Sequence, residues 1–495
     1  MLKQVASVVA KRHFAMRMKR IDAYRNHPLQ AQQQLFKNLL TRGAQTVWGQ
    51  QHQIQASWSY EQFAKCIPLQ DYNSLLPFIE RSREGERDVL WPGVTRWFAK
   101  SSGTSGAPSK FIPVTDEGLE QLHIRTGKDF LSCFLHQVPS SRFFMGKGLV
   151  MGGSCYPENR AFTGDVSAIL MKNLPGWIQH YRTPGLEVAL IPQWQEKLDA
   201  IARTTSRQNI TNISGVPSWT LLLLQRVLDL TGAKDIGTLW PELEFYAHGG
   251  VSMLPYRSSF EALVGRKMNY FNVYNASEGF FAFQDVIDAD DMLLACDNGV
   301  FYEFISLGSG SHGDVVPLEA VTTQVPYAMV ITTNCGLWRY QLGDTIQFTS
   351  LFPHRIQITG RTQHFINAFG EEVTVANADS AIAAAAHQTG AMVREYTAAP
   401  CFISGHRGCH EWAIEFLQPP ANLDLFTHAL DLELQLRNSD YAAKRSGDLL
   451  MTMPIVHEVA PGRFYAWLQQ ERQLGVQQKL MRLHQSRQFL EAILR

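Results

Sequence analysis

The sequence has no excess of charge of either sign, because 45 lysine and arginine residues balance 45 aspartate and glutamate residues among 495. Nucleic-acid binding needs a basic patch or stripe, and no such stripe recurs along this chain. We therefore expect no nucleic-acid partner. A small molecule is the ligand that this composition favours.

Long apolar runs are also missing. The longest, the leucines at 221–224, falls far short of the roughly 20 residues that cross a bilayer. The seven cysteines are odd in number, widely scattered and without a CxxC pair, which argues against a disulfide framework and for a reducing compartment. We expect no membrane span and a cytoplasmic protein.

One segment departs from the neutral average. Residues 1–27 contain seven lysines and arginines against the single acid Asp22, a composition that mitochondrial transit peptides share. We expect an N-terminal helix whose apolar side packs on the body of the protein, with a targeting segment as the alternative. The residues of that apolar side are Val5, Val9, Phe14, Met18 and Ile21.

The length and the 45% of apolar residues predict two or more domains, because one core would be too large. Residues 1–90 have mainly helical patterns, including a helix with Leu35, Leu39 and Leu40 that is expected to end at Gly49. From Arg96 onward, short β-like runs alternate with helical runs. This alternation predicts an α/β fold with a mixed or parallel sheet. Three later strand-like runs, at 299–308, 327–340 and 355–361, predict an antiparallel sheet or a small barrel.

The pattern changes after residue 360. An alanine-rich helical run at 375–390, a strand-like run at 411–417 and a second helical run at 422–436 predict a separate α+β domain. We expect a boundary at 359–363. It would divide the chain into a large N-terminal domain, residues 1–360, and a smaller C-terminal domain, residues 361–495.

Six small residues after a strand-like run carry the clearest ligand-binding pattern. Their backbone N–H groups can point inward together and form an anion-binding concavity, with Lys110 four residues later. Their spacing matches neither G-x4-G-K-[ST] nor G-x-S-x-G, so neither a P-loop NTPase nor a nucleophile elbow is supported. A solvent-exposed linker is the alternative, and it is disfavoured because strand-like and helix-like segments lie close on both sides. The six residues are Ser101, Ser102, Gly103, Thr104, Ser105 and Gly106.

Three further motifs follow strand-like runs. In YNASEGF, residues 274–280, the Tyr274 ring can stack on a base and Glu278 can approach a phosphate-bound Mg²⁺. Asp344 and the glycine before it are expected to form a turn between two strands, where Asp344 can accept hydrogen bonds from a ribose diol. Gly249 and Gly250 allow close approach of a ligand to the backbone. Ordinary strand-ending turns are the alternative for each motif.

Taken in order, six stretches resemble the motifs of the adenylate-forming superfamily: SSGTSGAPSKFIPVT, HGGVS, YNASEGF, WRYQLGD, GRTQHFINAFGEEV and GVQQKLMR. The chain is most similar to the auxin-responsive branch, the acyl acid amido synthetases that conjugate plant hormones to amino acids and have bacterial relatives. The resemblance covers about residues 35–482. It implies a large adenylation domain with mixed sheets and a barrel-like part, and a smaller, mobile α+β domain.

The resemblance implies a two-step reaction that uses ATP and Mg²⁺. A carboxylic acid and ATP give an acyl adenylate and pyrophosphate, and the amine of an amino acid then attacks the acyl carbon to give an amide and AMP. The small domain would swing about the GRTQ hinge between the two steps. Two alternatives stay open: an adenylating ligase with CoA or a carrier protein as thiol acceptor, and a nucleotide-binding relative with weak catalysis. The second is favoured by departures from the family pattern at Gln363, at Glu371 with the glutamate after it, and at Leu480.

The resemblance also implies roles for individual residues. Ser101 to Gly106 would hold the phosphates with Lys110 nearby, and Glu278 would face Mg²⁺ or the phosphates. Lys479 would be delivered to the phosphate or carboxylate during adenylation, with a solvated helix lysine as the alternative. Tyr274 would stack on the base and Asp344 would bind the ribose. The remaining nucleotide-site residues are Gly249, Gly250, Val251, Ala276, Ser277 and Arg361, and the candidate walls of the acyl pocket, for which core packing is the alternative, are Trp219, Phe280 and Phe281.

Overall fold

The computed structural model describes residues 2–101, 110–158, 160–191, 194–307, 313–361, 365–369, 371, 373–404, 407–445, 451–470 and 480–495. The chain forms two compact units. Unit 1 contains residues 1–215, 242–250 and 268–357, and unit 2 contains residues 216–241, 251–267 and 358–495. This division is discontinuous along the chain, whereas the expected one was continuous. The expected hinge near 359–363 stays a prediction.

Unit 1 begins with the helical layer expected for residues 1–90. The helix expected to end at Gly49 ends instead at Gly43, because Thr46 caps a new helix by accepting a 2.9 Å hydrogen bond from the Gly49 backbone N–H. The ring of Trp338 packs so closely on Gly43 that a Cβ there would lie 2.0 Å from it. The helices of this layer are α1 (Leu2–Asn26), α2 (Pro28–Gly43), α3 (Val47–Gln51), α4 (Tyr60–Cys66) and α5 (Tyr72–Arg83).

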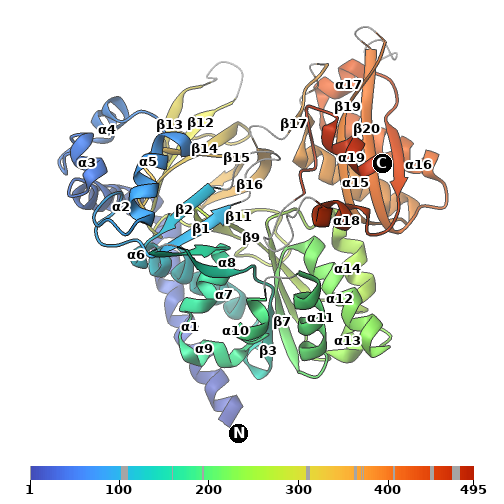
Figure 1. The fold of residues 1–495 in the computed structure, drawn as a ribbon, viewed down its shortest axis with the longest axis horizontal. Helices are drawn as coiled ribbons and strands as arrows, with labels where there is room; N and C mark the ends of the chain where they lie inside the picture. The colour runs from blue at the N-terminus through green and yellow to red at the C-terminus, as the bar shows by residue number, and fades with distance from the viewer. Residues whose placement is uncertain are drawn as a thin grey trace. The chain divides into compact units, whose positions relative to one another are not determined.

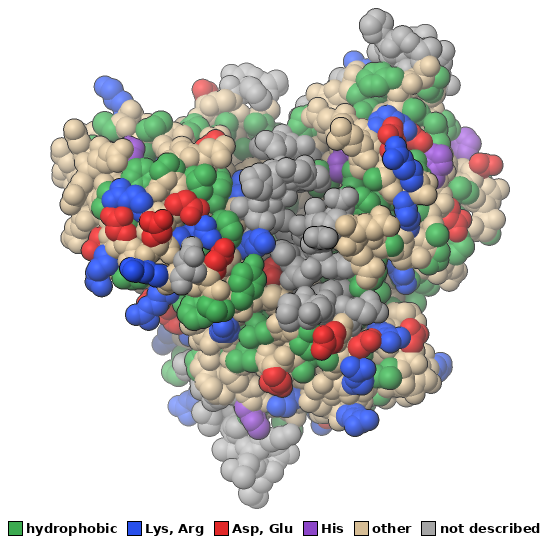
Figure 2. Space-filling model, viewed as in Figure 1, with side chains coloured by type: hydrophobic (Ala, Val, Ile, Leu, Met, Phe, Trp, Pro, Cys, Tyr) green, Lys and Arg blue, Asp and Glu red, His purple; other side chains and the backbone are tan. Residues whose placement is uncertain are grey.

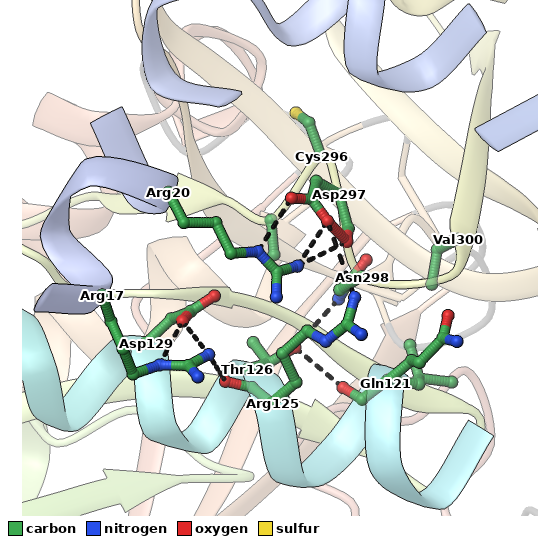
Figure 3. A network of polar contacts seen from close by, with 12 residues as sticks. Arg17, Arg20, Gln121, Arg125, Thr126, Asp129, Cys296, Asp297, Asn298 and Val300 are labelled. Atoms are coloured by element: carbon green, nitrogen blue, oxygen red, sulfur yellow. Dashed lines mark hydrogen bonds and ion pairs between the residues drawn. The ribbon is translucent and has the colours of Figure 1, made fainter. Parts of the chain in front are cut away.

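Helix α1 is held to unit 1 by ion pairs made from its basic residues. Arg17 Nε donates a 3.0 Å hydrogen bond to Asp129, and Arg20 Nε donates a 3.0 Å hydrogen bond to Asp297 (Figure 3). The Ile21 side chain, which follows Arg20 in the sequence, is fully buried. The packed helix that we expected is therefore confirmed for this part of the segment. The predicted contacts of Val5 and Val9 lie outside the described side chains.

One mixed sheet forms the centre of unit 1 and confirms the expected α/β class (Figure 1). Strands from β9 to β6 in the sheet order are parallel, and strands from β13 to β9 are antiparallel where their pairing is defined. The antiparallel strands expected after residue 299 thus continue the parallel sheet. The order in the described chain is β13 (Val315–Pro317), β12 (Val300–Ser306), β14 (Pro326–Thr333), β15 (Tyr340–Leu351), β16 (His354–Arg361), β11 (Met292–Leu294), β10 (Gly279–Phe283), β9 (Asn269–Ala276), β8 (Phe245–Gly249), β7 (Ile210–Gly215), β3 (Lys147–Val150) and β6 (Arg182–Thr183).

A smaller sheet and several helices complete unit 1. The small sheet has the order β2 (Lys110–Val114), β1 (Trp97–Ser101), β5 (Ala161–Gly164) and β4 (Cys155–Glu158). The segment after β2 is one helical stretch in which a π-helical turn, η1 (Leu119–Ile124), joins α6 (Asp116–Gly118) to α7 (Arg125–Gln137). The other helices are α8 (Val166–Asn173), α9 (Gly176–Tyr181), α10 (Leu186–Ala189) and α11 (Trp194–Thr205).

Unit 2 contains the α+β arrangement predicted for the C-terminal part. Its described sheet has the order β19 (Met392–Ser404), β20 (Arg407–Gln418) and β21 (Ile455–Val459), and β17 (Phe365–Ile366) pairs with β18 (Val373–Thr374). The predicted alanine-rich helix is α15 (Val375–Thr389), and the second predicted helix is α16 (Leu423–Arg437). The remaining elements are α12 (Pro217–Thr231), α13 (Ile236–Leu239), η3 (Leu254–Tyr256), α14 (Arg257–Val264), α17 (Ser439–Arg445), α18 (Arg463–Gln470) and α19 (Gln488–Leu494).

Three expected absences can be compared with the described part of the chain. All seven cysteines are unpaired, as their scattered positions predicted. None of the described helices is both long and apolar enough to cross a membrane. On the face drawn in Figure 2, basic and acidic side chains are interspersed among the described residues, without an extended stripe of one sign.

Candidate functional site

The carboxyl ends of parallel strands gather the predicted glycine and tyrosine motifs at one edge of the large sheet. Strands β7, β8 and β9 are parallel neighbours, and Gly249 on β8 pairs with Val273 on β9. A Cβ on Gly249 would lie 2.4 Å from the Val273 carbonyl oxygen, so only glycine allows this approach. Gly250 has φ of 86°, in the left-handed region that favours glycine. Ligands of open α/β sheets bind at such an edge.

Tyr274 and Asp344 meet at this site, although 70 residues separate them along the chain. The Tyr274 hydroxyl donates a 2.7 Å hydrogen bond to Oδ2 of Asp344. The Tyr274 side chain is 4% exposed, and its ring lies 5.1 Å from the ring of Phe281. The structure therefore brings the predicted base platform and the predicted ribose acceptor into direct contact.

The expected turn at Asp344 is wrong. Asp344 lies inside strand β15, where the pairing with β14 shifts between Ala328 and Val330. Gly343 adopts φ of 83° at this bulge. A bulge inserts extra residues into one strand and re-aims the side chains beside it. The glycine therefore marks an irregular strand here, and the sequence alone does not distinguish this from a hairpin turn.

Ser277 and Glu278 form the turn between β9 and β10. Ala276 pairs with Gly279 across this two-residue connection. The Glu278 side chain is largely buried, at 9% exposure. A carboxylate oxygen is a hard donor of the kind that Mg²⁺ prefers, and Mg²⁺ usually binds one or two carboxylates together with substrate phosphates. The described residues contain no group of three or more His, Cys, Asp or Glu that could hold a metal ion, so Glu278 fits only this shared mode of binding.

The predicted phosphate-binding residues Ser102 to Gly106 lie outside the described residues, but their flanks are described. Ser101 ends β1 and pairs with Lys110 at the start of the antiparallel strand β2. We expected a helix directly after this segment. The structure has strand β2 there instead. Pro113 within β2 disfavours helix there, and Thr115 caps the helix that follows. Lys110 Nζ lies 5.8 Å from the centre of the Tyr72 ring.

Two buried residues beside this edge were missed by the sequence reasoning. Lys197 on α11 is fully buried, and its Nζ donates hydrogen bonds of 3.2 Å and 3.3 Å to the carbonyl oxygens of Gly152 and Gly153, just beyond β3. Burial lowers the pKa of Lys197 to about 8, and nearby Asp165 opposes the shift. Burial also lowers the pKa of His123, on the π-helical turn, to about 4. Nothing in the local sequence distinguishes either residue from a solvated one.

The candidate pocket aromatics are all buried. Phe280 is 7% exposed and Phe281 is fully buried in unit 1. In unit 2, Trp219 on α12 is 9% exposed, and its ring lies 6.3 Å from the ring of Tyr465. These positions agree with core packing as well as with a pocket wall, so the acyl-pocket assignment stays a prediction.

Of the other predicted residues of unit 2, the structure describes Val251 and Arg361. Val251 begins the segment that leads to η3, and Arg361 ends β16 with an exposed side chain. Lys479 lies outside the described residues. Its proposed delivery to the reaction therefore stays a prediction.

Known proteins resemble this chain over most of its length. Profiles of the GH3 family match its N-terminal domain at residues 17–268, its central domain at residues 293–361 and its C-terminal domain at residues 376–488. The 4-substituted benzoates-glutamate ligase GH3.12 of Arabidopsis thaliana is 25% identical over 404 residues, which are 66% of this chain and 67% of that protein.

Solved structures show the same fold. The AtGH3.15 acyl acid amido synthetase in complex with 2,4-DB has a TM-score of 0.79 and 18% identity, covering 96% of this chain and 95% of that one. A 2-hydroxyisobutyryl-CoA ligase in its postadenylation state has a TM-score of 0.59 and 12% identity, covering 94% and 90%. The expected fold of an adenylate-forming enzyme is thus confirmed. Because the N-terminal profile alone spans residues 17–268 of 495, the protein belongs to the GH3 family.

Proposed function

We propose that this protein is an ATP-dependent acyl acid amido synthetase. In the first step, a carboxylate oxygen of the acid attacks the α-phosphorus of ATP, which forms an acyl adenylate and releases pyrophosphate. In the second step, the amine nitrogen of an amino acid or another amine attacks the acyl carbon, loses a proton and displaces AMP. The names of GH3.12, a benzoates-glutamate ligase, and of GH3.15, an acyl acid amido synthetase, support these substrate classes.

The contact between Tyr274 and Asp344 carries the proposal. Their 2.7 Å hydrogen bond links an aromatic ring, which can stack on adenine, to a carboxylate, which can accept hydrogen bonds from a ribose diol. Gly249 and Gly250 lie at the same sheet edge and allow close approach of the backbone. An adenosine moiety is the ligand that this combination fits best.

The chemistry of the reaction assigns the remaining roles. A carboxylate is a poor electrophile, and joining it to AMP supplies a good leaving group. Negative charge builds up at the α-phosphorus, which needs donors and cations that are positioned in advance. Ser101 to Gly106 would hold the phosphates beside Lys110, and Glu278 would hold Mg²⁺ together with them. Bound Mg²⁺ would neutralise part of the phosphate charge.

Two further parts of the proposal concern the small domain and the compartment. Lys479 would approach the reacting phosphate or carboxylate during adenylation. The segment at 359–363 would let the small domain exchange this arrangement for one that admits the amine. The unpaired cysteines favour the cytoplasm as the compartment, because they suit a reducing environment.

A pyrophosphate exchange assay tests the first step. The purified protein is incubated with ATP, Mg²⁺ and labelled pyrophosphate over a panel of aromatic and aliphatic acids, and hydroxylamine traps any acyl adenylate as a hydroxamate. We expect exchange and hydroxamate with at least one acid. Absence of both with every acid, from a protein that is folded and binds ATP, would support the nucleotide-binding relative instead.

The acceptor is tested separately. With an acid that supports exchange, amino acids and CoA are supplied in parallel and the products are weighed by mass spectrometry. We expect an amide with an amino acid and no thioester. A thioester as the main product would replace the amido synthetase by the adenylating ligase with a thiol acceptor.

A further inference from the structure

Arg482 lies at the centre of a buried polar network in unit 2, which we call the Arg482 cluster. Its members are Arg482, Tyr256, Asp379, Glu395 and Tyr396, and none is more than 7% exposed. Arg482 forms an ion pair with Asp379 through Nη1 and donates a 2.7 Å hydrogen bond to the Tyr256 hydroxyl through Nη2. The Tyr256 hydroxyl in turn donates a 3.0 Å hydrogen bond to Glu395.

The guanidinium group of Arg482 also lies against two aromatic rings. It lies 5.3 Å from the centre of the Tyr256 ring and 4.9 Å from the centre of the Tyr396 ring. The Tyr396 hydroxyl donates a 2.5 Å hydrogen bond to Asp379. A buried charge with this many partners is costly to move, because any shift would leave a charged group without compensation.

The backbone around Arg482 is tied to strand β19. Ala398 N–H donates a 2.8 Å hydrogen bond to the Arg482 carbonyl oxygen, and His484 N–H donates a 3.0 Å hydrogen bond to Ala398. The Thr397 hydroxyl donates a 3.1 Å hydrogen bond to the carbonyl oxygen of Met481. Backbone and side chain together therefore fix the chain at residues 481–484.

The cluster joins two segments that belong to the proposed active site. Arg482 follows Lys479 by three residues, and a chain of three residues reaches at most about 11 Å. Tyr256 ends the short η3 turn that follows Val251, a predicted residue of the nucleotide site. One hydrogen bond between Tyr256 and Arg482 thus connects the segment after Val251 to the segment after Lys479.

We infer that Arg482 is a positioning residue for adenylation, which limits where Lys479 can reach by fixing the chain behind it to Tyr256 and Asp379. The inference rests on the proposed function, because it assigns Lys479 to the first step. Because Arg482 is only 4% exposed, we assign it no contact with the substrate. The cluster should therefore affect the rate of adenylation and leave the amine-transfer step unchanged.

The same unit contains a matched control. Arg445 donates hydrogen bonds of 2.8 Å and 2.9 Å to Asp431, and the Tyr441 hydroxyl donates a 2.7 Å hydrogen bond to the same carboxylate. These three residues are also buried. Tyr256→Phe and Tyr441→Phe each remove one hydroxyl from a buried network of arginine, tyrosine and carboxylate. A purely structural role predicts similar effects for the two variants.

The test measures both half-reactions in the full-length protein. We expect Tyr256→Phe to lower kcat of pyrophosphate exchange at least tenfold with KM for ATP nearly unchanged, because the lost positioning acts in the transition state. Aminolysis of chemically synthesised acyl adenylate should stay within twofold of the wild type. Tyr441→Phe should leave both half-reactions within twofold. Arg482→Lys, with Arg445→Lys as its control, should repeat this pattern.

A double-mutant cycle separates action through Lys479 from action elsewhere. If Tyr256 acts through Lys479, Tyr256→Phe should cause no further loss in a Lys479→Ala background. Additive losses would overturn the inference, as would equal losses in both half-reactions or equal effects of the two phenylalanine variants. A wild-type protein without exchange on any acid would instead overturn the proposed function, and this inference with it.

Discussion

The Tyr274 hydroxyl donates a 2.7 Å hydrogen bond to Asp344, although the strands that carry them, β9 and β15, are separated by β10, β11 and β16 in the sheet. Neighbouring strands lie about 4.8 Å apart, so a flat sheet would separate the two strands by about 19 Å. That gap is beyond the reach of the two side chains. The sheet must therefore curl strongly at this point, as a barrel-like part of the domain would.

The hydrogen bond between Tyr274 and Asp344 should matter for adenylation more than for stability. We expect Asp344→Asn to lower pyrophosphate exchange by orders of magnitude, and Tyr274→Phe to lower it about tenfold while costing about 1 kcal/mol of unfolding free energy. Tyr302→Phe is the control, since the Tyr302 hydroxyl is also buried and donates to the Ala295 carbonyl oxygen. A loss of stability without a change in exchange would favour a structural role for this contact.

Glu278 should determine the Mg²⁺ requirement. Glu278→Gln keeps the shape of the side chain and removes its charge, so we expect at least a hundredfold lower exchange and a higher Mg²⁺ concentration at half-maximal rate. The thermal unfolding midpoint should change little. The exposed Glu458 on β21 offers a control as Glu458→Gln. An unchanged Mg²⁺ dependence would remove Glu278 from the metal site.

Deletion of residues 1–26 should destabilise unit 1. The helix buries Phe14, Ile21 and Tyr24, and burial of three large apolar side chains is worth roughly 5 kcal/mol in total. The deletion also removes the ion pairs that Arg17 and Arg20 form with Asp129 and Asp297. The measurement is the midpoint of urea unfolding with and without the segment. An unchanged midpoint would favour the removable targeting segment.

Glu395 should make stability depend on pH. Burial raises the pKa of Glu395 to about 7, although Arg482 and Tyr256 favour its ionised form. Between about pH 4.3 and about pH 7, the folded protein binds this proton more tightly than the unfolded chain does, so stability falls as pH rises through that window. Glu395→Gln should remove the fall and gain at most about 4 kcal/mol over the wild type at pH 8.

Urea unfolding at pH 5, 6, 7 and 8 measures this difference. The titratable and charged groups that act on Glu395 are Arg482, Tyr256 and Glu415, and all three stay in place in the variant. Parallel pH profiles for Glu395→Gln and the wild type would show that Glu395 is ionised throughout.

Lys197 should show the opposite dependence at higher pH. Its pKa of about 8 lies below the value of about 10.4 expected in the unfolded chain. Between these values the unfolded chain binds more protons, so the wild type should gain stability relative to Lys197→Met as pH rises from 8 to about 10.4. Lys37→Met, at an exposed position of α2, should show no such gain. Urea unfolding of the wild type and of both variants at pH 7.5 and pH 9.5 measures this gain.

Much of the fold could be predicted because its signals are local. Short β-like runs identified β8 and β9, and an alanine-rich run identified α15, each from the pattern of near neighbours. The motif around Tyr274 could also be assigned to a strand end. The bulge at Gly343 could not be distinguished from a turn, because glycine with positive φ is typical of both.

The sequence by itself determined the class of the fold, the family and the order of the candidate site motifs, because these depend on short patterns. The tertiary structure decided which of these residues meet. Tyr274 contacts Asp344 across 70 residues, and Arg482 contacts Tyr256 across 226. Such contacts depend on the curl of a sheet and on burial by distant segments. A pattern of a few neighbouring residues predicts neither the curl nor this burial. The buried position of Lys197 and the contacts of the Arg482 cluster are therefore visible only in the folded chain.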